Sequence, residues 1–388
     1  RDHSFKVPRP DLTAELGTPN ACNGCHADES AGWAAEHITE WHGEDRPPSF
    51  ARAFAGGREG APEAEPELYR LAGDFATPDI VRATALSLLE RYPTVRAADA
   101  AVDLLQDSSA VVRATALRNL AARNLSAESD RQHTSRIEPL LTDSVRLVRT
   151  EAARVLTMIA PERYARDAED ETTRAYWSAL QEYRAGQLAL SEQAAAHLNL
   201  AVIHEQLGAL DSAATSYETA LRMDSTFVPA HLNLAMLYNR MRQEAGDAQE
   251  LGAAAERSLR AAVRLQPEMA QAHYTLGLLL AERPETFEEA SGHLLRAAEL
   301  DTANPRIQYN AGLAHQQLGD AETAERLLLN ANRLAPDHPD YLNALSVFYA
   351  QQEEWETALT YTDRLLQQFP DNADIRQRAD YIRQQMNR

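Results

Sequence analysis

The chain has 388 residues, a formal net charge of −20 and 25% charged residues. Its length predicts two or three domains rather than one. Of the 38 basic residues only Lys6 is a lysine, and so acidic a surface disfavours nucleic acid and anionic lipid as partners and favours a basic protein. No run of about 18 apolar residues is present, so we predict no transmembrane segment.

The composition favours an all-α fold. Arg, Ala, Glu and Leu are abundant, and these are strong helix formers. The period-2 alternation of apolar and polar residues that is typical of strands is almost absent. We therefore predict an all-α protein.

The first motif along the chain is Cys22-Asn23-Gly24-Cys25-His26, which uses every cysteine of the sequence. Thiols at this spacing can form thioethers with the vinyl groups on one edge of a porphyrin, and the adjacent histidine can then ligate the iron. We predict one haem c within residues 1–45, with Cys22 and Cys25 as covalent anchors and His26 as the proximal axial ligand. The rival interpretation is a zinc site, although the usual paired histidines are missing.

A haem iron usually takes a sixth ligand. The first methionine is Met158, far from the motif, so we expect a second histidine and hence a lower reduction potential than Met/His ligation gives. We rank His3 first as distal ligand, His42 second and His37 third. His3 lies in an irregular, proline-rich arm that is free to fold across the far side of the porphyrin.

Residues 28–41 read as a short amphipathic helix. Trp33, His37 and Trp41 recur every four residues along it, so they share one face. That face is expected to cover the haem, and His37 is then either an iron ligand or a packed side chain of this wall.

Residues 46–160 are predicted to form HEAT-like helical repeats. An aspartate, a valine-arginine pair, an alanine and a leucine recur three times, with arginines at positions 82, 113 and 149. The aspartates are expected to accept bonds from free N–H groups at the helix starts, while the apolar positions form one stripe. Residues 161–190 match neither repeat, and we predict connecting helices there.

Residues 191–388 carry a clearer repeat with a period of about 34 residues. Two small residues per unit would let paired helices approach closely, and proline closes three of the units. This resembles the tetratricopeptide repeat, with about five units and a polar capping helix over residues 372–386. The paired small residues are Ala201 and Ala213, Ala235 and Ala255, Gly277 and Ala290, Gly312 and Ala324, and Ser346 and Ala358.

Arrays of this kind present a concave groove that binds peptide or protein. Asn199, Asn233 and Asn310 share one repeat position and are expected to bond an extended peptide there. The alternative is that the repeats form only a spacer or an oligomer contact. No catalytic motif is present, so we list no catalytic residue.

The order Asp2-His3-Ser4-Phe5, Pro8-Arg9-Pro10, residues 17–22 and Cys25-His26, followed by both kinds of repeat, resembles the C-terminal part of bacterial multihaem cytochromes c that carry tetratricopeptide repeats. In that family further Cys-x-x-Cys-His sites precede this one, and the present sequence lacks them. It is then either a single-haem member or the tail of a longer chain. The resemblance also allows His3 to ligate a neighbouring haem.

Together these features predict an extracytoplasmic c-type cytochrome, periplasmic or extracellular in a bacterium. We expect either that a leader peptide has been removed or that the sequence is a fragment of a longer chain. We expect electron transfer by one histidine-ligated haem. The repeats would dock a redox partner protein or other cytochrome subunits, or assemble copies into a homo-oligomer or larger complex. The alternatives are a protein-binding scaffold with a structural haem or zinc, and a haem redox enzyme. An electron carrier is favoured over an enzyme.

Overall fold

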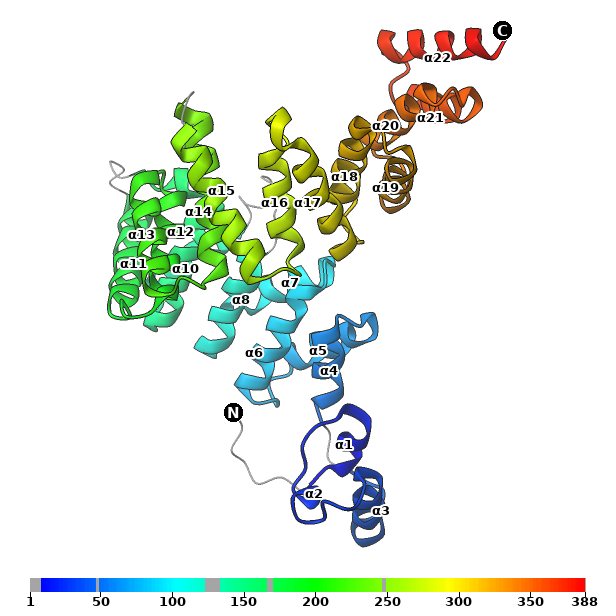
Figure 1. Cartoon of the computed structure of the whole chain (residues 1–388). Coiled ribbons are helices and arrows are strands. Elements are labelled where there is room, and N and C mark those ends of the chain that lie inside the picture. The colour runs from blue at the N-terminus through cyan, green and yellow to red at the C-terminus, as the bar shows by residue number, and fades with distance from the viewer. Residues whose placement is uncertain (1–7, 47–48, 123–132, 166–169, 246–248, 388) are drawn as a thin grey trace. The chain divides into compact units, whose positions relative to one another are not determined.

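The computed structural model describes residues 8–46, 49–122, 133–165, 170–245 and 249–387. The chain forms two compact units, Arg1–Leu190 and Ser191–Arg388. All secondary structure in the described ranges is helical (Figure 1), which confirms the prediction of an all-α fold. None of the helices described is both long enough and apolar enough to cross a membrane.

The first unit begins with three short helices around the cysteine motif, α1 (Pro10–Leu16), α2 (Cys22–Cys25) and α3 (Ala31–His42). Helix α3 begins where the Ser30 hydroxyl accepts a hydrogen bond from the Trp33 N–H at 3.0 Å. Helices α1 and α3 pack against each other. The buried apolar side chains of this segment are Pro10, Leu12, Ala34 and Ile38.

The rest of the first unit is a stack of helices in chain order. Helices α6, α8, α10 and α11 pack in succession, each against the next, while α5 and α7 cover the start of the stack. The elements are α4 (Ala51–Glu59), α5 (Glu65–Gly73), α6 (Asp79–Leu88), α7 (Val95–Asp103), α8 (Ala110–Ala122), α10 (Arg146–Ile159) and α11 (Glu171–Leu188).

Three arginines at equivalent repeat positions connect the helices of this stack. Each guanidinium pairs with a carboxylate from the next helix or from the turn before that helix. The second and third arginines also donate to the main-chain carbonyl of the aspartate ahead of their own helix, at 2.6 and 2.8 Å. We call this series the arginine ladder; its pairs are Arg82 with Asp107, Arg113 with Asp143, and Arg149 with Glu182.

The first pair of the ladder is fully buried. The side chains of Arg82 and Asp107 are 1% and 0% exposed. Arg82 also donates through Nε to the Ala72 carbonyl at 3.1 Å, and its guanidinium lies over the Phe75 ring at 4.4 Å from the ring centre. Because both charges have left water, each depends on the other for compensation.

The second unit consists of helix pairs that follow one another along the chain (Figure 1). Within each pair the helices pack closely, and each pair packs on the next. The pairs are α12 (Ala194–Gln206) with α13 (Leu210–Met223), α14 (Val228–Ala245) with α15 (Gln249–Leu265), α16 (Ala270–Leu280) with α17 (Phe287–Leu300), α18 (Pro305–Leu318) with α19 (Ala321–Leu334), and α20 (Pro339–Gln351) with α21 (Trp355–Gln368). Helix α22 (Ala373–Met386) then covers α21.

The small residues predicted to allow close approach lie where the paired helices cross. Ala201, Ala213 and Ala290 are each 0% exposed. At Gly277 an added Cβ would lie 2.8 Å from Leu294 Cγ and 3.1 Å from the Ala290 carbonyl oxygen. A methyl group therefore has no room at this crossing.

Removing the carboxylate of the buried pair should destabilise the first unit severely. We expect Asp107→Ala to lower the free energy of unfolding by about 3–5 kcal/mol, because the Arg82 guanidinium is left buried and uncompensated. Urea unfolding followed by circular dichroism measures this. Glu15→Gln, which breaks the exposed pair with Arg52, is the control and should leave the unfolding curve unchanged. Equal losses in both variants would contradict the role of burial.

Filling the crossing at Gly277 should destabilise the second unit. We expect Gly277→Ala to lower the free energy of unfolding by about 1–3 kcal/mol through overpacking against Leu294. Gly292, on α17, has no atom within 4 Å of an added Cβ, so Gly292→Ala should stabilise the protein by up to about 1 kcal/mol through helix propensity. Thermal unfolding should show a lower melting temperature for Gly277→Ala and a higher one for Gly292→Ala. A higher melting temperature for Gly277→Ala would refute the close approach of α16 and α17.

Candidate functional site

The cysteine motif forms its own short helix at the edge of a cleft. Cys22 and Cys25 begin and end α2, and the His26 N–H donates to the Cys22 carbonyl at 2.9 Å. Residues three apart on a helix share one face, so the two thiols lie on the same side. The cleft has a volume of about 280 Å³ and is lined by Ala21, Cys22, Cys25, His26, Trp33, Ala34, His37, Ile38 and Trp41.

A row of aromatic rings lines one wall of this cleft. The ring centres of His26 and Trp33 are 5.0 Å apart, those of Trp33 and His37 are 4.4 Å apart, and those of His37 and Trp41 are 5.7 Å apart. His37 is further fixed because its Nδ1 lies 3.0 Å from the Trp33 carbonyl oxygen. The predicted face of Trp33, His37 and Trp41 therefore covers the cysteine motif.

The candidate distal ligands differ in their placement. His37 lines the same cleft as His26, with the Trp33 ring between the two imidazoles. His42 is exposed at the end of α3 and does not line the cleft. His3 lies outside the described residues.

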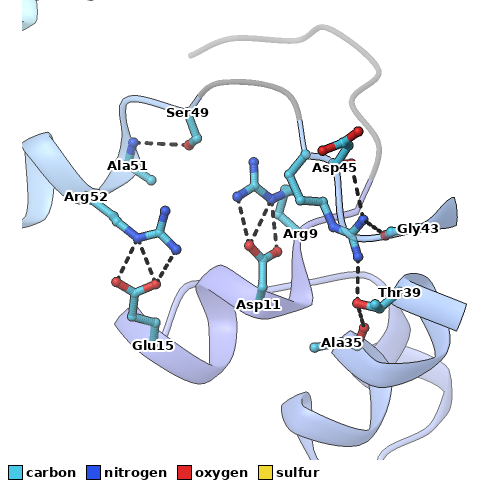
Figure 2. Close-up of polar contacts among 11 residues, drawn as sticks. Arg9, Asp11, Glu15, Ala35, Thr39, Gly43, Asp45, Ser49, Ala51 and Arg52 are labelled. Carbon is cyan, nitrogen blue, oxygen red and sulfur yellow. Dashed lines mark hydrogen bonds and ion pairs between the residues drawn. The ribbon is translucent and has the colours of Figure 1, made fainter.

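Polar contacts hold the cleft segment against the helices that follow (Figure 2). Arg52, on α4, pairs with Glu15 on α1 at 2.7 Å. Arg46 donates to Thr39 Oγ1 at 2.8 Å and to the carbonyl of Gly43, which ties the chain after α3 back onto that helix. The Arg52–Glu15 pair thus links the segment to α4, whereas the Arg46 bonds lie within the segment itself.

The residues of the cleft fit a haem better than they fit a zinc ion. Structural zinc takes four protein ligands. The described residues contain no group of three or more His, Cys, Asp or Glu side chains that could hold a metal ion. A porphyrin brings its own equatorial nitrogens, so the protein need supply only thiols on one edge and one or two axial side chains. Cys22, Cys25 and His26 are side chains of these types beside an aromatic wall, and the attachment of a haem to them stays a prediction.

A second hollow of about 470 Å³ lies among α14, α15 and α16 of the repeat unit. Met236 and Leu278 occupy equivalent positions in successive repeats and are 53% and 40% exposed within it. Polar side chains from the same helices surround these two, among them Asn239, Arg240 and Gln271. An apolar centre with a polar rim suits a protein segment as ligand.

The repeat asparagines have partners inside the array. Asn310 donates to the Tyr274 hydroxyl of the preceding repeat at 2.7 Å. Asn233 bonds the hydroxyl of Tyr217. A peptide that used these amides would have to compete with the bonds that join neighbouring repeats, so their expected contact with a ligand stays a prediction.

Three repeat histidines have a structural role that the sequence reasoning did not identify. Nε2 of each lies about 3 Å from the main-chain carbonyl oxygen six residues earlier, so each histidine fixes the turn before its own helix. Their shared register in the repeat was the available signal. They are His197, His231 and His273.

One of these histidines, which is buried, pairs with a second histidine that is partly buried. Nδ1 of His273 and Nδ1 of His293 are 2.9 Å apart, and His273 Nε2 faces the Pro267 carbonyl at 3.1 Å. Because the carbonyl takes a proton from Nε2, His273 Nδ1 must accept from His293. Burial lowers the pKa of both imidazoles below the ordinary value of 6.5, and His273 adds to the lowering at His293.

Comparison with known families identifies the repeats of the second unit. The family model of the tetratricopeptide repeat matches residues 174–226, 244–305 and 309–373. The first match begins within α11, inside the segment expected to connect the two kinds of repeat. Residues 1–173, with the cysteine motif, lie outside the matched ranges.

Individual relatives are distant. The TPR repeat-containing protein PA4667 of Pseudomonas aeruginosa is 30% identical over 110 residues, which are 28% of this chain and only 18% of that protein. Among solved structures, MamA is 21% identical, covers 47% of this chain and 94% of its own, and has a TM-score of 0.40. YrrB, described as a TPR protein with an unusual peptide-binding site, is 24% identical, covers 50% and 93%, and has a TM-score of 0.42.

The chain therefore contains a tetratricopeptide-repeat scaffold, a fold suited to protein–protein interaction. This conclusion rests on the family match and on the helix pairs it covers. It does not extend to the cysteine motif, whose role rests on the cleft geometry alone.

The pair of His273 and His293 should make the free energy of unfolding depend on pH. Below about pH 6.5 these histidines bind protons in the unfolded chain but not in the folded chain, because folding lowers their pKa. The free energy of unfolding therefore falls with decreasing pH until the folded histidines also bind protons. We expect His293→Gln to flatten this dependence between about pH 7.5 and pH 5 in urea unfolding. His338→Gln, at a side chain 43% exposed, is the control and should keep the wild-type slope. An unchanged slope in His293→Gln would contradict this assignment.

Proposed function

We propose that this chain is an extracytoplasmic c-type cytochrome in which one covalently held haem serves electron transfer and the repeats bind a protein partner. The observation that supports this most is the position of the Cys-x-x-Cys-His motif on a one-turn helix that faces an aromatic cleft. Haem supplies a one-electron redox centre when it is bound. Periplasmic or extracellular location follows from the chemistry of attachment and is part of the proposal.

Each residue of the motif has a distinct role in this proposal. Cys22 and Cys25 anchor the porphyrin edge through thioether bonds, and His26 ligates the iron. Trp33, whose ring contacts that of His26, excludes water from the ligand and restricts the orientation of the imidazole. Burial of this kind and second-sphere contacts of the axial ligand tune a reduction potential.

His3 remains the proposed distal ligand, followed by His42 and His37. His37 has a place in the α3 wall already, since it stacks on Trp33 and bonds the Trp33 carbonyl. The same bond would also orient its free Nε2 toward a metal. Replacing the three candidate histidines one at a time distinguishes them, because only loss of the true sixth ligand should change the visible spectrum of the iron.

A second candidate function is that of a protein-binding scaffold in which the cleft is purely structural. The family match supports this candidate, because it covers the repeats and not the cysteine motif. The two functions share the repeat unit and differ only in whether the cleft carries a redox centre.

The mass and the visible spectrum of the intact protein distinguish these functions. We expect the mass of one haem in excess of the polypeptide and a sharp α band on reduction. Cys22→Ser/Cys25→Ser should lose the covalent haem, while Asn372→Ala, at the start of α22 in the second unit, should keep it. An unmodified wild-type mass with stoichiometric zinc would refute the cytochrome and leave the scaffold.

The spin state of the iron then identifies the sixth ligand. We expect His3→Ala to convert low-spin iron to high-spin iron, and His37→Ala and His42→Ala to leave the spectrum unchanged. If His37→Ala instead converts the iron from low-spin to high-spin, the sixth ligand is His37 on α3. Wild-type iron that is already high-spin and binds added ligands would favour the haem enzyme over the electron carrier.

A further inference from the structure

Two asparagines, Asn20 and Asn23, hold the turn that carries the cysteine motif. The main-chain N–H of Asn23 donates to Asn20 Oδ1 at 3.1 Å. Asn20 Nδ2 donates to Asn23 Oδ1 and to Thr13 Oγ1, each at 2.9 Å. Asn23 Nδ2 in turn donates to the Glu29 carbonyl at 2.8 Å and to the His26 carbonyl at 3.4 Å. Both protons of each side-chain amide are therefore used.

These contacts leave one arrangement of the two amide groups. A main-chain N–H can only donate, so the atom of Asn20 that meets it is the side-chain oxygen. Asn20 Nδ2 must then face Asn23 Oδ1, and Asn23 Nδ2 faces main-chain carbonyls, which can only accept. An aspartate at position 23 would supply no N–H to these carbonyls. The network thus requires an amide between the two cysteines.

The network extends beyond the short helix α2. Capping α2 would need only the bond from the Asn23 N–H to Asn20 Oδ1. The other bonds lead to Thr13 on α1 and to Glu29, which directly precedes Ser30, the residue that caps α3. A four-residue helix is too short to be stable by itself. These bonds therefore connect α2 to both of its neighbouring helices.

The main chain of His26 is held on both sides of its Cα atom. Its N–H donates to the Cys22 carbonyl at 2.9 Å, and its own carbonyl accepts from the Glu29 N–H at 3.2 Å and from Asn23 Nδ2. The bond from Asn23 to Glu29 also restrains the start of α3, and with it Trp33, whose ring centre lies 5.0 Å from that of His26. Asn23 thus restrains both the motif histidine and the aromatic ring beside it.

We infer that Asn20 and Asn23 are positioning residues, which hold the Cys-x-x-Cys-His turn in the conformation that receives a haem. The inference rests on the proposed function. Because protein bonds alone order the turn, attachment does not bear the entropic cost of ordering it. After attachment the same amides keep the His26 imidazole directed at the iron and Trp33 beside it, which limits the access of water. Both asparagines act through the main chain of the motif rather than as ligands.

The test compares the covalent haem content and the reduction potential of the full chain with those of two variants. Asn23→Asp keeps the side-chain size and the acceptor for Asn20 but removes the N–H groups that bind the carbonyls. Asn23→Ala removes both. We expect each variant to carry about tenfold less covalent haem. The loaded fraction should have a lower reduction potential, because water reaches the iron ligand. Asn304→Ala, which removes a cap in the repeat unit, is the control and should keep both values.

Hydrogen exchange supplies a readout that does not depend on haem. In the Cys22→Ser/Cys25→Ser background we expect Asn23→Asp to speed exchange of the main-chain amides of residues 22–30 about tenfold, with an unchanged urea unfolding curve. Faster exchange with unchanged haem content and potential in the loaded chain would refute the inference, because the asparagines would then only cap α2. Unchanged exchange would refute it as well.

The mass of the wild-type chain separates this inference from the proposal on which it rests. An unmodified wild-type mass refutes the cytochrome and the inference together. A wild-type chain that carries haem, with variants that carry as much haem at the same potential, refutes the inference alone.

Discussion

Close approach of paired helices at small side chains is the constraint on which the second unit depends. Alanine, glycine or serine stands at each crossing, and at Gly277 even one methyl group would collide with Leu294 and with the Ala290 carbonyl. Helices this close bury the neighbouring leucines and tyrosines of both helices. Each helix pair then packs through its outer side against the next pair. Because contacts reach only neighbouring pairs, the array can lengthen without one large core, and it needs a polar cover such as α22 at its end.

In the first unit, arginine–carboxylate pairs connect the stacked helices. Its arginine ladder joins α6, α8, α10 and α11. Each arginine bonds a carboxylate in the neighbouring helix or in the turn before it. The second and third arginines also bond a main-chain carbonyl in the turn before their own helix. Such pairs fix the register of one helix against another, since a guanidinium and a carboxylate meet only in a narrow range of geometries. The buried rung of Arg82 and Asp107 gives little net stability beyond a well-packed apolar pair, yet breaking it is costly. The ladder therefore specifies how the helices stack more than how strongly they do.

The cleft segment is formed partly by residues adjacent in sequence and partly by a separate helix that packs beside them. Cys22, Cys25 and His26 are adjacent in sequence, so a one-turn helix is enough to bring them together. The wall opposite comes from a separate helix, α3, which packs against α1 and is bonded to the chain that follows it through Arg46.

The sequence alone determined the helical class, the small-residue positions and the cysteine motif, because each is encoded by residues at fixed local spacing. It also predicted that Trp33, His37 and Trp41 share a face, since four-residue spacing places side chains on one side of a helix. It did not reveal that the ladder arginines reach the next repeat or that His273 pairs with His293. These contacts join residues from different helices, and only the packing of one helix on another decides which polar groups meet.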